Sequence, residues 1–217
     1  DVCSSDLIVI KEEEMTRDKS GSSKVGEKKR KKETELFSAA YELFTTKGTQ
    51  NTAIDDIVKR AGVAKGTFYL YFKDKYDIIN RLILQKSSQV IKEAVEKTEE
   101  QKLDRFEDRT LFFIDYVINY FKENKLMLKL INKNFSWGLF RRALRNPEQY
   151  KEMEGIVEIF IGNLVEKNMN LDEAELTLFM IFELVGSVCY SSIILEEPTT
   201  IDEIKPILFK KVLAMIS

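Results

Sequence analysis

The sequence predicts an all-α protein, and three features of its 217 residues support this class. Only nine Gly and three Pro occur, too few for the turns of a chain with many short strands. Apolar residues recur at steps of three and four positions through long segments, which is the spacing of an amphipathic helix. Good helix formers, above all Leu, Glu, Lys and Ala, build these segments. With 44% hydrophobic residues, the chain can bury one or two cores.

Residues 1–29 are predicted to form a disordered, charged arm, because charged and small residues dominate this part of the chain. The basic run from Lys28 to Lys32 either only solvates the chain or adds contacts to a polyanion, and both interpretations stay open. Residues 1–7 lack the basic and apolar regions of a secretory signal. They look like the translation of a sequencing adapter, so we expect Met15 to be the native start.

Two helices are predicted after the arm. Residues 33–47 carry the amphipathic spacing, and Gly48 supplies a natural C-terminal stop. Thr52 is predicted to cap the second helix, with Asp55 as its capping-box partner three residues later. That helix is expected to end at Gly62.

Residues 64–72 predict a short third helix, in which Phe68 and Phe72 face the core and the polar residues face outward. Asp74, with Asp77 three residues later, is predicted to cap a longer fourth helix that links two domains. The pattern stays helical to the C-terminus, without strand signals. The later helices are expected over residues 111–121, 126–139, from Pro147 onward, 172–195 and 200–216.

Charge is distributed unevenly along the chain, although the whole sequence carries a net charge of only −2. Residues 24–92 hold fifteen Lys and Arg against eight Asp and Glu, a net charge of +7. Residues 1–23 and 93–217 have net charges of −3 and −6. A polyanion is therefore expected to dock on the basic third of the chain.

The sequence contains no His, which removes His-based acid/base chemistry, Ser-His-Asp and Cys-His nucleophiles and His-containing metal sites. The two cysteines, Cys3 and Cys189, lie far apart in different contexts, so neither a disulfide framework nor a zinc site is indicated. We expect no enzymatic activity, no metal and no cofactor. A reducing cytoplasm suits this cysteine content.

Residues 53–72 predict the core of a helix-turn-helix, because two helices meet at a glycine turn and the second presents polar groups outward. Gly66 lacks a Cβ and permits close approach to a nucleic-acid backbone, and Lys65 offers a cation. Hydroxyl groups suited to phosphates or base edges come from Thr67, Tyr69 and Tyr71. The competing interpretation is an ordinary helical hairpin with solvated side chains, which the glycine inside a short helix and the basic charge disfavour.

The same segment resembles the N-terminal signature of TetR-like regulators. The matching residues are Phe44, Gly48, Thr52, Ile57, Ala61-Gly62-Val63, Lys65-Gly66-Thr67, Tyr69, Tyr71-Phe72 and Lys75. The resemblance implies a helix-turn-helix DNA-binding domain over residues 30–90 and a helical effector-binding and dimerisation domain over residues 91–217. The positions that it places on double-stranded DNA are Thr52, Lys65, Gly66, Thr67, Tyr69, Tyr71 and Lys75. Ala64 and Tyr71 stand where many relatives carry a Ser or Thr cap and a His, which leaves the operator sequence open.

Residues 176–195 are nearly continuous in apolar character, a length that would admit a membrane span. Glu183 and three serines interrupt the run, so we favour a helix packed among helices or against a second subunit. By the resemblance, the last two helices of each subunit form a four-helix dimer interface, and the dimer reads a pseudo-palindromic operator. Glu183 is interpreted either as a site for a cationic, lipophilic effector or as an ordinary salt bridge or exposed residue.

An apolar pocket for an unknown small apolar or cationic effector is predicted in the second domain. The candidate residues are Phe112, Tyr116, Tyr120, Trp137, Phe179 and Glu183. The resemblance implies a homodimeric repressor that the effector releases from its operator. The alternatives are a partner-controlled or architectural DNA-binding protein of the same fold, and a helical enzyme or membrane-associated protein, for which no residue set can be named.

Overall fold

The computed structural model describes residues 24–134, 136–144 and 147–217. It confirms the all-α class, because every element of the described residues is a helix and none is a strand. The N-terminal elements are α2 (Lys24–Thr46), α3 (Ile54–Ala61), α4 (Lys65–Tyr69) and α5 (Lys75–Glu100). The remaining elements are α6 (Phe106–Glu123), α7 (Lys125–Asn134), α8 (Trp137–Leu144), α9 (Pro147–Glu166), α10 (Leu171–Cys189), the π-helix η1 (Tyr190–Leu195) and α11 (Ile201–Ile216).

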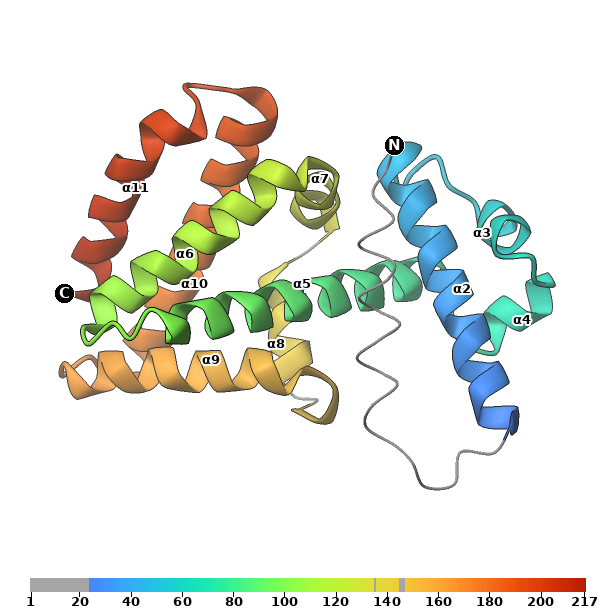
Figure 1. The fold of residues 1–217 in the computed structure, drawn as a ribbon, viewed down its shortest axis with the longest axis horizontal. Helices are drawn as coiled ribbons and strands as arrows, with labels where there is room; N and C mark the ends of the chain where they lie inside the picture. The colour runs from blue at the N-terminus through green and yellow to red at the C-terminus, as the bar shows by residue number, and fades with distance from the viewer. Residues whose placement is uncertain (1–23, 135, 145–146) are drawn as a thin grey trace.

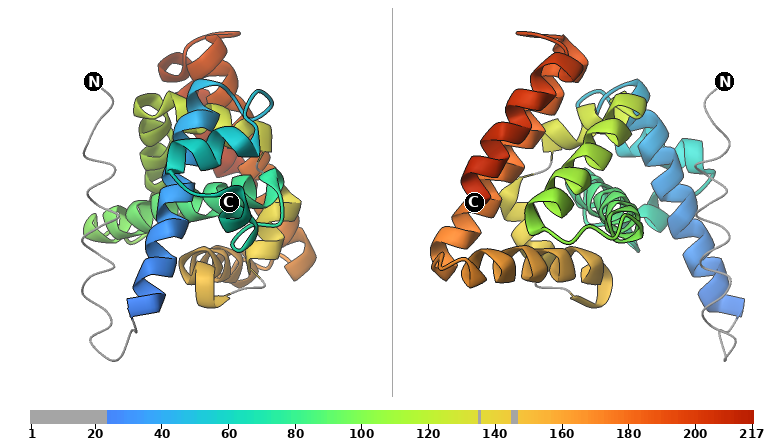
Figure 2. Two further views of the ribbon diagram at one scale, coloured as in Figure 1. Left: turned by 90° about the vertical axis from the view of Figure 1, so that its right-hand side faces the viewer. Right: turned by 60° about the vertical axis from the view of Figure 1, so that its left-hand side comes forward.

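The long helix α5 joins two groups of helices (Figure 1). Helices α2, α3 and α4 pack around its N-terminal end, and α6 and α9 run beside its C-terminal half. In the left view of Figure 2 the N-terminal group faces the viewer, and α10 and α11 lie behind it. The arrangement leaves α4 at the end of the molecule that is remote from α10 and α11.

Two hydrophobic cores stabilise the fold. The first joins α2, α3, α4 and the first half of α5, and it includes the fully buried Leu36, Ile57 and Phe68. The second joins α6, α9, α10, η1 and α11. Helix α7 contributes to both, since Met127 belongs to the first core and Leu128 to the second. The predicted boundary between the two domains, at residue 90, falls inside α5. Residues of α7 and α8, which lie after this boundary, also contribute to the first core.

The prediction of a disordered arm up to residue 29 is wrong for its last part, because α2 begins at Lys24 instead of residue 33. Lys, Arg and Glu are good helix formers, and the packed part of α2 provides a helix that they extend by one hydrogen bond per residue. Residues 27–32 are exposed along this extension. The predictions for residues 1–23, including the adapter and the start at Met15, lie outside the described residues.

One predicted cap is wrong, one helix starts earlier than predicted, and one cap is confirmed. The backbone N–H of Ala53 donates to Asp56 Oδ2 at 3.0 Å, so α3 starts one position later than the predicted Thr52 and Asp55 box. Asn170 Oδ1 accepts from the N–H of Glu173 at 2.9 Å, so α10 starts before residue 172. Asp74 caps α5 as predicted, because its Oδ1 accepts from the N–H of Asp77 at 2.9 Å.

The predicted helix over residues 126–139 is two helices, α7 and α8, separated between Asn134 and Trp137. The continuous apolar pattern hid the break because both helices pack on the same first core. Helix α10 continues into the π-helix η1 and ends at Leu195, as predicted. Thr200 and Glu203 start α11, which accommodates Pro206 in its second turn.

Candidate DNA-binding face and effector site

Helix α4 is held in place by two phenylalanines. Phe68 and Phe72 are 0% and 1% exposed, and their rings lie 5.4 Å apart. Phe72 also meets the edge of Phe37 from α2, with ring centroids 5.0 Å apart. A five-residue helix is too short to be stable alone, so this aromatic packing determines its orientation.

The turn between α3 and α4 is closed by Gly62, whose φ of 67° lies in the left-handed region that favours glycine. The N–H of Val63 donates to the carbonyl of Val58 at 3.0 Å, which satisfies the end of α3. The turn therefore brings α4 across α3 in the arrangement that the sequence predicted for a helix-turn-helix.

The outward side of α4 carries most of the predicted DNA-contacting residues. Lys65, Gly66 and Tyr69 are exposed, and Thr67 and Tyr71 are half-buried. The ammonium group of Lys65 lies 2.8 Å from Oδ1 of Asp55 on α3. The hydrogen bond to Asp55 raises the pKa of Lys65 above its ordinary value, so this side chain stays cationic.

Thr52 was predicted on the DNA-contacting face, and the structure contradicts this placement. Its side chain is 1% exposed, and its hydroxyl donates to the carbonyls of Gly48 at 2.9 Å and Leu43 at 3.3 Å. The single hydroxyl proton is therefore shared between an acceptor in the last turn of α2 and one in the loop that follows it. Its role is structural, because no lone donor remains for a phosphate.

Lys75 also serves the loop between α2 and α3. Its ammonium group donates to the carbonyls of Thr49 at 2.8 Å and Thr52 at 3.1 Å, and the side chain is half-buried. Two of its three donors are therefore engaged inside the domain, and the predicted contact of Lys75 with DNA stays a prediction. The residue ties α5 to the loop that precedes α3.

Sequence reasoning missed Leu70, which is 77% exposed directly after α4. The prediction for residues 64–72 placed Phe68 and Phe72 in the core and polar residues outside, and it gave Leu70 no role. The available signal was its spacing: Leu70 follows Gly66 by four residues and lies two from both Phe68 and Phe72, so it cannot share their buried face.

The structure brings together two of the predicted effector residues. The rings of Trp137 and Phe179 meet edge to face, with centroids 5.3 Å apart, and Phe140 and Phe182 complete an aromatic cluster. Trp137 and Phe179 also line an open hollow of about 240 Å³. The other lining residues are Arg141, Asp172, Glu175 and Leu176.

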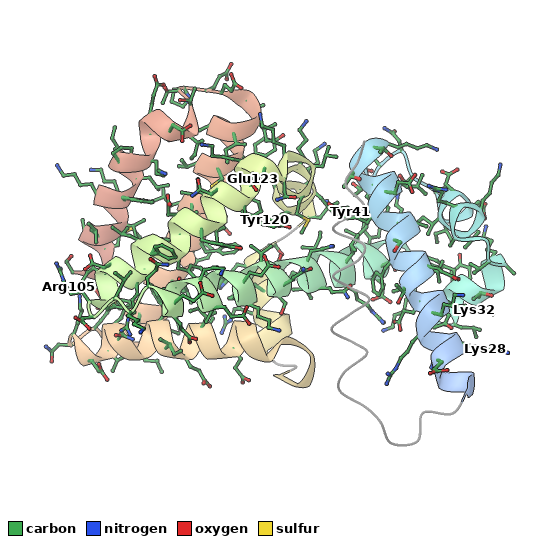
Figure 3. The ribbon with its side chains drawn as sticks, in the orientation of Figure 1. Lys28, Lys32, Tyr41, Arg105, Tyr120 and Glu123 are labelled. Carbon is green, nitrogen blue, oxygen red and sulfur yellow. The ribbon has the colours of Figure 1, made fainter. Side chains whose placement is uncertain are left out.

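The other predicted effector residues lie elsewhere. Phe112 and Tyr116 are half-buried on α6, and the hydroxyl of Tyr116 donates to Glu93 Oε2 of α5 at 3.3 Å. Burial, together with Glu93, raises the pKa of the Tyr116 phenol. Tyr120 packs against both cores near the α7 end of α6 (Figure 3). Glu183 is exposed on α10, which agrees with the second of its two interpretations, and it does not line the hollow.

Within the part of the chain that the structure describes, no group of three His, Cys, Asp or Glu residues is placed to hold a metal ion. Arg141 lies 3.9 Å from Glu175 at the hollow, which leaves Asp172 as the uncompensated charge among its lining residues. The hollow therefore combines an aromatic wall with a weakly acidic rim.

Comparison with known proteins places these features in a family. The N-terminal model of bacterial regulatory proteins of the tetR family matches residues 36–82. A fatty acid metabolism regulator protein of Bacillus subtilis is 40% identical over 73 residues, which cover 34% of this chain and 38% of the relative. The HTH-type transcriptional regulator YdgC of the same species is 29% identical over 158 residues, covering 70% of this chain and 75% of the relative.

Solved structures share the whole fold. The crystal structure of the transcriptional regulator FadR from Bacillus subtilis, in complex with stearoyl-CoA, superimposes with a TM-score of 0.61 at 19% identity. The match covers 85% of this chain and 100% of that one. The family match coincides with α2, α3, α4 and the start of α5, where the helix-turn-helix lies. Residues 36–82 carry the N-terminal domain of the tetR family of bacterial regulatory proteins.

Proposed function

We propose that this protein is a homodimeric repressor that binds a pseudo-palindromic operator through α4 and is released by a small-molecule effector. The observation that carries the proposal is the outward face of α4. Two buried phenylalanines orient this helix, so that Lys65, Gly66 and Tyr69 are exposed to solvent. A short helix with an exposed cation, hydroxyls and a glycine suits the major groove. Thr67 and Tyr71 flank this face and supply further hydroxyls. Such a regulator would act on the chromosome in the cytoplasm.

A second copy of the chain is the proposed occupant of the outer side of α10 and α11. Leu176 and Met180 of α10 are 59% and 47% exposed, and Ile207 of α11 is also exposed. Exposed apolar residues on two helices that pack against each other suit an interface. A two-fold axis through this face would give the dimer two copies of α4, as a palindromic operator requires.

The segment Leu171–Leu195 is also long and apolar enough to cross a membrane, with a mean hydropathy of 2.0 and 22% of the window buried. Its inner side packs against α6, α7, α9 and α11, within the second core. A membrane span would have to leave this core, and Glu183 would enter the bilayer. A protein interface requires neither change, so we favour the dimer.

The hollow beside Trp137 and Phe179 is the proposed effector site. Its aromatic wall suits an apolar molecule, and Asp172 on its rim suits a cationic group. Phe140 stacks on Phe182 of this cluster, contacts Trp137 and belongs to the first core, which also contains α4. A ligand that moves Trp137 would therefore shift Phe140 and, through the first core, the position of α4.

The DNA-binding proposal is tested with purified protein and DNA fragments that flank its own gene, over a salt series. We expect salt-sensitive binding to one fragment and its loss in a variant with Lys65→Ala and Tyr69→Ala. Lys129→Ala, an exposed charge on α7, is the matched control and should bind as the wild type does. Equal, weak binding to every fragment by all three proteins would refute the proposal.

The dimer is tested by light scattering after size-exclusion chromatography. Leu176→Glu with Met180→Glu should give a monomer that retains helical content, because a desolvated carboxylate at an apolar interface is costly. Leu126→Glu on α7 introduces a charge at another exposed apolar position and should leave the dimer intact. A monomeric wild type would contradict the assignment.

The effector proposal is tested with two probes of different chemistry. Tetraphenylphosphonium is apolar and cationic, and stearoyl-CoA is the ligand bound by FadR from Bacillus subtilis. We expect tetraphenylphosphonium to lower operator affinity in the wild type and to have a reduced effect in Phe179→Ala. If only stearoyl-CoA releases the protein from the operator, the effector is anionic and not cationic. If neither probe changes operator affinity, the hollow is not the effector site.

A further inference from the structure

Leu70 stands out on the surface beside α4. It has the highest exposed fraction, 77%, of the large apolar side chains in the described part of the chain. Its backbone is right-handed helical, with φ −74° and ψ −20°, so it continues the geometry of α4. An exposed leucine on a helix of charged and hydroxyl-bearing residues gains nothing in the free protein.

The spacing of α4 places Leu70 opposite its buried side. At 3.6 residues per turn, both Gly66 and Leu70 are rotated by about 160° from Phe68 around the helix axis. A Cβ added to Gly66 would meet no atom within 4 Å, so the space outside Gly66 is open. Leu70 and Gly66 therefore form the centre of the outward face, with Tyr69 at one edge and Thr67 at the other.

This composition separates two kinds of contact. Lys65, Thr67 and Tyr69 are donors suited to phosphates, which position a protein without reading sequence. Leu70 carries no donor or acceptor and cannot pair with the polar edges of guanine, cytosine or adenine. The C5-methyl group of thymine is the apolar group that the major groove offers.

We propose that Leu70 is a specificity-determining residue that packs against a thymine C5-methyl group in each operator half-site. Gly66 lets the helix approach closely enough for this contact, since its missing side chain leaves room for the DNA. A cytosine or adenine at the same position would have its amino group desolvated against leucine, which disfavours those bases. The inference rests on the proposed function and adds to it the chemistry of base selection.

The test replaces each thymine of the operator, one position at a time, with deoxyuridine, which lacks only the methyl group. We expect one position per half-site at which the wild-type protein loses about fourfold in affinity, the equivalent of one buried methyl group. Leu70→Ala should bind the unmodified operator more weakly and be indifferent to deoxyuridine at that position. Thermal unfolding of this variant should match the wild type, because the side chain is exposed.

Leu126→Ala is the matched control, since it truncates an exposed leucine on α7 and should keep the wild-type response to deoxyuridine. Equal deoxyuridine sensitivity in the wild type and Leu70→Ala would overturn the inference. An operator whose binding no thymine methyl affects would overturn it as well, while leaving the proposed function intact. Wild-type protein that prefers no fragment would instead refute the proposed function itself.

Discussion

The ammonium group of Lys65 lies 2.8 Å from Oδ1 of Asp55, so an acid of α3 pairs with the first cation of α4. Both side chains are more than half exposed, which makes the pair weak and sensitive to salt. A phosphate that approaches Lys65 must compete with Asp55 and is repelled by it. If α4 binds DNA as proposed, Asp55 therefore lowers the affinity of Lys65 for phosphate in DNA of any sequence.

Asp55→Asn is accordingly expected to tighten DNA binding by about two- to fivefold at low salt, the range of one exposed ion pair. The gain should be similar for operator and unrelated DNA, because phosphates carry no sequence information. Fluorescence anisotropy with both DNAs measures it. Asp202→Asn breaks an exposed pair with Lys122 far from α4 and should change neither affinity. Weaker binding by Asp55→Asn would contradict the expectation.

Gly66→Ala should separate stability from DNA binding. Alanine favours a helix by up to about 1 kcal/mol over glycine, and its Cβ meets no atom within 4 Å here, so urea unfolding should require more denaturant. Operator affinity should fall at least about tenfold, because the methyl group occupies the space of the approaching DNA. Gly162→Ala, also exposed and unobstructed on α9, serves as control. It should gain stability and keep the wild-type affinity; an unaffected Gly66→Ala would refute close approach.

The N-terminal extension of α2 carries basic residues on the side of α4. Lys28 and Lys32 lie one turn apart, and Figure 3 shows both on the side of α2 toward α4. Ala39 lies on the same side of α2 as these two lysines and is buried in the first core. This side of α2 therefore faces the other helices of the first core. DNA bound to α4 would therefore extend past Lys28 and Lys32.

Replacing both lysines with glutamine should lower the slope of log affinity against log salt by about 0.9 for each phosphate that a lysine no longer neutralises, about 1.8 per subunit. Operator preference over unrelated DNA should persist, because these contacts read no bases. The control replaces Arg30 and Lys31 with glutamine, which removes the same amount of charge from other sides of the helix. If both double variants shift the slope equally, general charge is responsible and the directed contact is refuted.

Much of the DNA-binding unit could be predicted from local patterns. Asp74 caps α5 because the cap involves residues three apart, and Phe68 and Phe72 face the core because helical spacing determines their side. Such features depend on neighbours in the chain, which a single sequence displays. The turn at Gly62 was predictable for the same reason, since its left-handed φ favours glycine.

The remaining features depend on contacts between distant segments. Thr52 and Asp55 match a capping box, yet the end of α2 offers Thr52 two carbonyl acceptors and buries it. Trp137 and Phe179 meet although 42 positions separate them, and no local pattern distinguishes them from Phe112 or Tyr116. Tertiary packing decides these roles, so sequence reasoning proposed all of them and could not select among them.

Thr52→Val tests the structural role that replaces the predicted DNA contact. Valine keeps the shape of the side chain and removes the hydroxyl, so the carbonyl of Gly48 loses this donor, whereas that of Leu43 still accepts from the N–H of Lys47 at 2.9 Å. We expect the free energy of unfolding to fall by about 1–3 kcal/mol, the cost of an unsatisfied buried acceptor. Thr52→Ser keeps the donor and serves as control. A Thr52→Val variant with wild-type stability but weakened DNA binding would instead support the predicted contact between Thr52 and DNA.

The buried thiol of Cys189 should lower the free energy of unfolding at alkaline pH. The residue is fully buried on α10, and burial raises the pKa of its thiol to about 12 from an ordinary value of 9.0. Because the folded pKa is higher, the unfolded chain releases the proton first as pH rises above 9. The thiol's contribution is therefore complete below pH 9 and declines between pH 9 and about 12, by roughly 1.4 kcal/mol for each pH unit.

Comparison with Cys189→Ala isolates this contribution from the titration of lysines and tyrosines. The alanine variant should be less stable at pH 7, because it leaves a cavity. The difference in unfolding free energy from the wild type should narrow by about 1.4 kcal/mol at pH 10. Urea unfolding at both pH values measures the two differences, and Val212→Ala, a core truncation without a titrating group, is the control. A constant difference for Cys189→Ala would mean that the thiol ionises as readily in the folded protein as in water, and its burial in the second core would then be incorrect.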